Sequence, residues 1–115
     1  MNPKGYVVIR EADAQIRELL ERWLREAGYQ VAPANLGDTK PTLVIADVPE
    51  PRAAERLIGT LQEEYAAPIL IISARFRRGL AGSAEAARQL GVEKLLPKPF
   101  TRKELLAAVR ESVAA

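Results

Sequence analysis

The stretch Leu95-Leu96-Pro97-Lys98-Pro99-Phe100 places a single lysine between two prolines, directly after a short apolar run. Proline fixes its own φ angle and biases the residue before it toward an extended backbone. The pattern predicts a strand followed by a lysine whose ammonium group points in one direction. Two other apolar runs also end in a small polar residue, Leu43-Val44-Ile45-Ala46-Asp47 and Ile69-Leu70-Ile71-Ile72-Ser73. An acid, a hydroxyl and a lysine share one site only if these strand ends are neighbours, as they are in a parallel sheet.

Apolar runs alternate with segments of helical period along the chain. The runs typical of strands are residues 6–9, 30–32, 43–46, 69–72 and 94–96. Apolar residues from Ile16 to Ala27 recur at helical spacing, and Gly28 ends that helix. Further helices are expected to begin near Pro51, to run from about Gly82 to Leu90, and to follow the capping box of residues 101–104.

The segment between Pro33 and Pro41 is too short for a full helix and contains Gly37, so a loop or single turn is expected there. The remaining order predicts one α/β domain over residues 1–115, with a doubly wound, five-stranded parallel sheet whose second helix is shortened or missing. Ligands of such sheets bind at the carboxyl ends of the strands, where strand order reverses. This rule places residues 10–13 (Arg-Glu-Ala-Asp) beside Asp47, Ser73 and Lys98.

The composition is that of a single folded domain, with 115 residues of which 48% are hydrophobic. Lys and Arg exceed Asp and Glu by only 17 − 15 = 2, so we expect no nucleic-acid partner. No apolar run approaches the roughly 18 residues of a membrane span, and no signal peptide is expected. The chain has no cysteine, which favours a cytoplasmic location, and no histidine, which removes the commonest general base and transition-metal ligand.

In this order the motifs resemble the receiver domain of two-component response regulators, the CheY-like proteins with a flavodoxin-like fold. Residues 7–20 resemble the opening strand, acidic pair and first helix of that family, and residues 26–29 its glycine stop. Residues 41–48 are similar to the strand that ends in the phosphoacceptor aspartate. Residues 69–74 resemble the strand with the switch hydroxyl, and residues 96–100 the lysine motif. The resemblance covers nearly the whole chain.

The resemblance implies a signalling module and not an enzyme. Asp47 would accept a phosphoryl group from a histidine kinase or phosphotransfer protein, with Lys98 as counter-charge and Ser73 as switch hydroxyl. A divalent cation, held by the acidic pair and the phosphoacceptor, would offset the charge of the phosphate. The output would pass to a downstream protein partner.

The acidic pair of the family falls on Glu11 and Ala12, so one expected metal ligand is a methyl group. Asp13 either reaches into the pocket or serves only to favour the amino terminus of the helix. The candidate metal ligands are therefore Glu11, Asp13 and Asp47, and magnesium (Mg²⁺) binding is expected to be weakened. Arg10 occupies a position that is usually apolar in the family, where its charge can replace part of the lost metal charge.

Two classes of function remain open from the sequence. The first is a phosphoacceptor switch, and the second is a pseudo-receiver that binds proteins without being phosphorylated. A flavin- or nucleotide-binding enzyme of the same fold is disfavoured, because no glycine-rich loop follows the first strand. The basic segment Arg75–Arg78 is either a solvated surface or a contact for an acidic partner.

Overall fold

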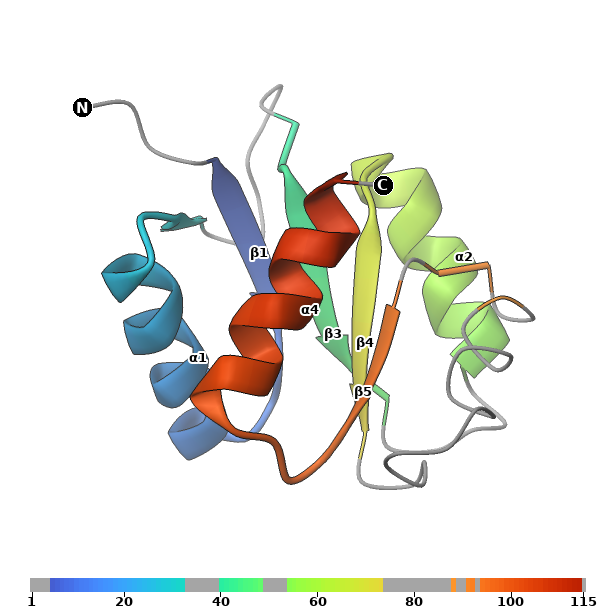
Figure 1. The fold of residues 1–115 in the computed structure, drawn as a ribbon. Coiled ribbons are helices and arrows are strands. Elements are labelled where there is room, and N and C mark those ends of the chain that lie inside the picture. The colour runs from blue at the N-terminus through green and yellow to red at the C-terminus, as the bar shows by residue number, and fades with distance from the viewer. Residues whose placement is uncertain are drawn as a thin grey trace.

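The five expected strands form one parallel sheet in the computed structural model, which describes residues 5–32, 40–48, 54–73, 88, 91–92 and 94–114. The strand order is β2-β1-β3-β4-β5 (Figure 1). The elements in chain order are β1 (Tyr6–Arg10), α1 (Ala14–Glu26), β2 (Gln30–Ala32), β3 (Leu43–Asp47), α2 (Ala54–Tyr65), β4 (Ile69–Ser73), β5 (Lys94–Pro97) and α4 (Arg102–Ala114). The predicted fold class is confirmed.

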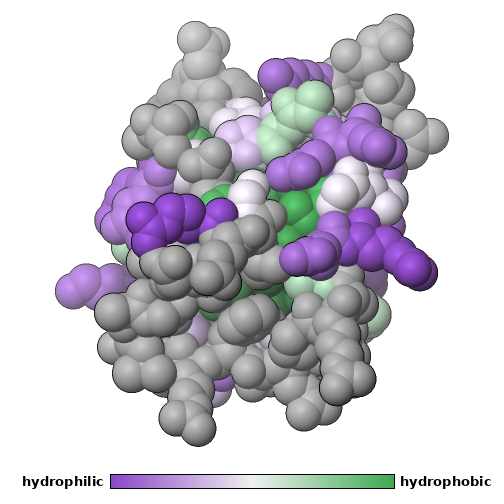
Figure 2. Space-filling model, turned by 90° about the vertical axis from the view of Figure 1, so that its right-hand side faces the viewer, coloured by the Kyte–Doolittle hydropathy of each residue, from purple (hydrophilic) through white to green (hydrophobic). Residues whose placement is uncertain are grey.

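Helices cover both faces of the sheet, α1 and α4 on one side and α2 on the other (Figure 1). Strand residues alternate between two apolar cores, so that Val44 and Ile71 pack toward α2 while Ile45 and Ile72 pack toward α1 and α4. A strand covered on both faces has no solvated side, which explains the uninterrupted apolar runs of β3 and β4. On the α2 side, the coloured residues of Figure 2 are mostly hydrophilic at the surface, with apolar residues visible between them.

Three strands extend one residue beyond the expected bounds because their polar terminal residues still pair with a neighbour. Arg10 pairs with Ala46, Asp47 with Ile72, and Ser73 with Pro97. The fifth strand likewise ends at Pro97 rather than Leu96. Because the ladder fixes the backbone of these residues, their side chains leave the sheet edge in defined directions.

The helix ends follow the sequence signals. Asp13 is the N-cap of α1, and Gly28 adopts a positive φ of 99° after that helix ends. At the start of α4, the backbone N–H of Thr101 donates to Glu104 Oε1 at 2.9 Å, and the N–H of Glu104 donates to Thr101 Oγ1 at 3.1 Å. The predicted capping box is confirmed.

Some expectations fall outside the described residues. They concern the basic segment 75–78, the segment 33–39 and most of the helix expected over residues 82–90, of which only Arg88 is described, as helical. Ten residues, 33–42, join β2 to β3, fewer than the dozen or more that a crossover with a full helix needs. This length is consistent with a shortened second helix. Within the described part of the chain, no helix has the length and apolar character to cross a membrane.

Candidate functional site

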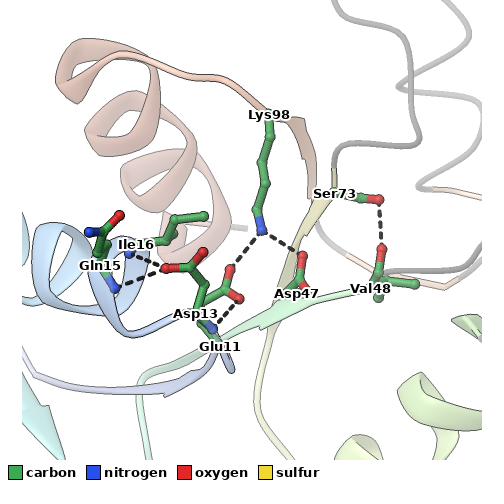
Figure 3. Close-up of polar contacts among 8 residues, drawn as sticks. All are labelled: Glu11, Asp13, Gln15, Ile16, Asp47, Val48, Ser73 and Lys98. Atoms are coloured by element: carbon green, nitrogen blue, oxygen red, sulfur yellow. Dashed lines mark hydrogen bonds and ion pairs between the residues drawn. The ribbon is translucent and has the colours of Figure 1, made fainter.

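Lys98 is held at the carboxyl edge of the sheet between two carboxylates (Figure 3). Its Nζ donates to Asp47 Oδ1 at 2.8 Å and to Glu11 Oε1 at 2.7 Å. These contacts join the residue after β1, the end of β3 and the residue after β5. The expected approach of Lys98 to Asp47 is confirmed, whereas the bridge to Glu11 was not anticipated from the sequence.

The three charged groups are partly or almost completely withdrawn from water. The side chains of Glu11, Lys98 and Asp47 are 2%, 16% and 19% exposed. Burial by itself would lower the pKa of Lys98, but the hydrogen bonds to Asp47 and Glu11, and the charges of both, outweigh it and raise the pKa above its ordinary value of 10.5. Lys98 is therefore a permanent cation at neutral pH, and it faces one more negative charge than it can neutralise.

The hydroxyl of Ser73 is completely buried at the end of β4. Its Oγ donates to the carbonyl of Val48 at 2.6 Å, and Figure 3 shows this bond directed away from Lys98. The backbone N–H of Lys98 donates to the carbonyl of Ser73 at 2.9 Å. In this arrangement Ser73 connects the backbone after Asp47 with the backbone that carries Lys98.

Asp13 points its carboxylate into the first turn of α1. Its Oδ1 accepts from the backbone N–H groups of Gln15 at 2.9 Å and Ile16 at 3.2 Å (Figure 3). Its own N–H donates to Glu11 Oε2 at 3.1 Å, which helps to orient that carboxylate. Of the two interpretations left open by the sequence, the structure shows Asp13 in the helix-capping arrangement.

The oxygen donors at this edge do not fit a resident magnesium ion as they are arranged. In the described ranges, no group of three or more acidic, histidine or cysteine side chains is placed to hold a metal. Glu11 and Asp47 each already bond Lys98, and Ala12 adds no oxygen. Magnesium requires nearly octahedral oxygen coordination and gives up its water reluctantly.

An open pocket of about 470 Å³ lies beside Asp47, between β1 and β3, where strand order reverses. The described residues that line it are Ile9, Arg10, Glu11, Ala12, Arg17, Asp47 and Leu57. Arg10 Nη1 donates to the hydroxyl of Tyr65 at 3.2 Å and lies 3.7 Å from Glu64 Oε1. Arg17 was not recognised in the sequence. The sequence signal that could have identified Arg17 as a pocket residue was its position four residues after the capping Asp13.

A second, apolar groove of about 360 Å³ borders Lys98 on the other side. It is lined by Ile16, Leu19, Lys98, Pro99 and Phe100, from α1 and the segment after β5. The ring of Phe100 packs edge-on against Trp23, with 6.4 Å between the ring centroids, so this wall is anchored to α1. Lys98 thus belongs to both the charged site and the neighbouring groove.

A doubly wound parallel sheet that gathers an acid after its first strand, an aspartate at its third and a lysine after its fifth has the architecture of a receiver domain. The comparisons agree. The chain is 34% identical over 119 residues to the transcriptional regulatory protein PdtaR of Mycobacterium tuberculosis. The match covers 94% of this chain and 56% of that protein. No family model matches the chain.

Solved structures give the same result. A response regulator receiver protein from Burkholderia phymatum superposes with a TM-score of 0.71 at 26% identity, over 96% of both chains. A response regulator from Thermotoga maritima superposes with a TM-score of 0.77 over 100% of both chains, and at 20% identity it supports the fold alone. The chain has the fold of a receiver domain and is similar to response regulators over nearly its whole length. It spans about half the length of the curated relatives it matches.

Proposed function

We propose that this domain is a phosphoacceptor of two-component signalling, in which Asp47 accepts a phosphoryl group from a histidine kinase or phosphotransfer protein. The observation that carries the proposal is the 2.8 Å contact between Lys98 Nζ and Asp47 Oδ1 beside an open pocket. A carboxylate oxygen of Asp47 attacks phosphorus, the P–N bond to the donor imidazole breaks, and an acyl phosphate forms. The imidazole leaves with the electron pair of that bond and takes up a proton.

Lys98 supplies a fixed positive charge throughout this transfer. Phosphoryl transfer places little covalent demand on a protein, so positioning and electrostatic stabilisation carry most of the catalysis. A pre-oriented ammonium that is only 16% exposed acts more strongly than one in open water. After transfer the same group can bind a phosphoryl oxygen, while Glu11 keeps it at the edge of the sheet.

The donor protein must bring its imidazole close to Asp47, and the apolar groove beside Lys98 suits that docking. Its apolar lining from α1 and from Pro99 and Phe100 offers a partner helix a surface to bury, next to the charged site. Modified Asp47 would in turn be read by a downstream protein. Both partners belong to this proposal.

Intact-mass spectrometry after incubation with phosphoramidate, a small phosphoryl donor, tests the proposal directly. We expect the mass gain of one phosphoryl group, and Asp47→Asn should abolish it because the amide is not a nucleophile. Lys94→Met, which changes an exposed lysine at the other end of β5, serves as the control and should still be modified. A protein that gains no phosphoryl group from phosphoramidate or from a histidine kinase would contradict the proposal and favour the pseudo-receiver.

A further inference from the structure

We propose that the pocket beside Asp47 is an oxyanion site that works without a metal ion, with Arg17 and Arg10 as its positive wall. Its ligand is a tetrahedral phosphate group. The inference deepens the proposed function, because that ligand would be the phosphoryl group on its way to Asp47. The site itself can be tested with free inorganic phosphate, which needs no transfer.

The charges at the edge of the sheet require cations beyond Lys98. Glu11 and Asp47 contribute two negative charges and Lys98 one positive charge. A phosphoryl group adds about two more negative charges at neutral pH. The oxygen donors do not fit a magnesium ion, so the compensating charge has to come from side chains. Among the described residues that line the pocket, the cations are Arg10 and Arg17.

Arg10 forms the fixed part of this wall. It is the last residue of β1, paired in register with Ala46, and its Nη1 is held by the hydroxyl of Tyr65 at 3.2 Å. Glu64 lies 3.7 Å away, but the two side chains of that pair are 40% and 46% exposed, so the pairing is weak. A guanidinium group has five donors in a planar fork, so Arg10 can keep its bond to Tyr65 and still face an anion.

Arg17 forms the adaptable part of the wall. It lies in the first turn of α1, where its backbone N–H donates to the carbonyl of Asp13. In the described part of the structure, its guanidinium has no ion-pair or hydrogen-bond partner, although it lines a pocket with two carboxylates. Ala12 lines the same pocket and contributes only a methyl group to it. An unpaired guanidinium at an open pocket is suited to bidentate binding of phosphate.

The experiment is an NMR titration of the isotope-labelled protein with inorganic phosphate, in EDTA and at constant ionic strength. Four proteins are compared, the unaltered chain, Arg17→Gln, Asp47→Asn and the control Arg22→Gln. Arg22 is also an exposed arginine of α1 but does not line the pocket. We expect phosphate to shift the amides of residues 10–12 and 47 in the unaltered protein.

Arg17→Gln should weaken phosphate binding about fivefold, the upper range for an exposed charge pair. Asp47→Asn should tighten it by a similar factor because it removes a repelling charge, and Arg22→Gln should change it less than twofold. Equal affinities for Arg17→Gln and the unaltered protein, an equal loss in Arg22→Gln, or no effect of Asp47→Asn would each overturn the inference.

Failure of this inference can be told apart from failure of the proposed function. Phosphorylation of Asp47 with an unchanged phosphate affinity in Arg17→Gln would contradict the arginine wall alone. Arginine-dependent phosphate binding in a protein that phosphoramidate never modifies would support the wall and contradict phosphoacceptance.

Discussion

The two lysines at the ends of β5 are in opposite electrostatic situations. Lys94 begins the strand and pairs with Glu111 of α4, with side chains that are 43% and 57% exposed. Lys98 follows the strand and pairs with Glu11 and Asp47, which are mostly or almost completely buried. The two lysines thus lie at opposite ends of one short strand, and only the lysine at the carboxyl end is largely withdrawn from water.

This difference separates a surface contact from a functional site. Exposed ion pairs contribute about 0–1 kcal/mol, because water already solvates both charges. A buried carboxylate that loses its partner has no such compensation, so breaking a buried pair costs several kcal/mol. The carboxyl edge is therefore the edge where one substitution can change both stability and chemistry.

Replacing Lys98 with methionine is the largest test of this comparison. Lys98→Met keeps a flexible chain of similar size but leaves Glu11 and Asp47 without their shared ammonium. We expect a loss of about 3 kcal/mol in the free energy of unfolding, measured by urea denaturation. A loss below about 1 kcal/mol would show that water or a neighbouring group already compensates Glu11.

The pH dependence of the same variant gives an internal control. Because the pKa of Lys98 is raised in the folded state, its contribution is fully present below the ordinary value of 10.5 and is lost as the pH rises through the higher folded value. The stability difference between Lys98→Met and the unaltered protein should thus stay constant through neutral pH and shrink only above 10.5.

The sequence was sufficient for the sheet and for the meeting of Asp47 and Lys98. Both follow from general rules, since buried parallel strands are apolar throughout and their carboxyl ends share one edge. The same rules could not give the partner of the Ser73 hydroxyl. A buried hydroxyl takes whichever acceptor its rotamer reaches, and here that acceptor is the carbonyl of Val48.

The bridge from Lys98 to Glu11 was also beyond the sequence. Eighty-seven residues separate Lys98 from Glu11, and strand order shows only that their edges are close. The Asp13 carboxylate can either accept hydrogen bonds from the first backbone N–H groups of α1 or turn toward the pocket, and the sequence does not decide between these two arrangements. Capping prevails in the structure, with two backbone donors on Oδ1.

A change at Ala12 tests whether the carboxyl edge of the sheet can be made to bind magnesium, with a smaller expected change in free energy than Lys98→Met. Ala12→Asp adds a third carboxylate near Glu11 and Asp47, so a divalent cation gains a charged oxygen and can compete with Lys98. We expect magnesium affinity, measured by calorimetry, to rise about tenfold, or about 1.4 kcal/mol. Ala12→Asn is the matched control and should gain less. Equally tight magnesium binding by the unaltered protein would show that Glu11, Asp13 and Asp47 suffice.

The smallest effect is expected at the opposite end of β5. Lys94→Met removes an ion pair between two solvated side chains, so the free energy of unfolding in urea should change by about 0.5 kcal/mol or less. That change should vanish in high salt, which screens exposed charges but reaches buried ones far less. The double variant Lys94→Met with Glu111→Gln should be no less stable than Lys94→Met alone. An unpaired Glu111 is already solvated by water, so removing its charge brings no further loss. If Lys94→Met lowers the free energy of unfolding as much as Lys98→Met does, burial does not explain the difference between the two lysines. The electrostatic distinction drawn between the two ends of β5 would then be wrong.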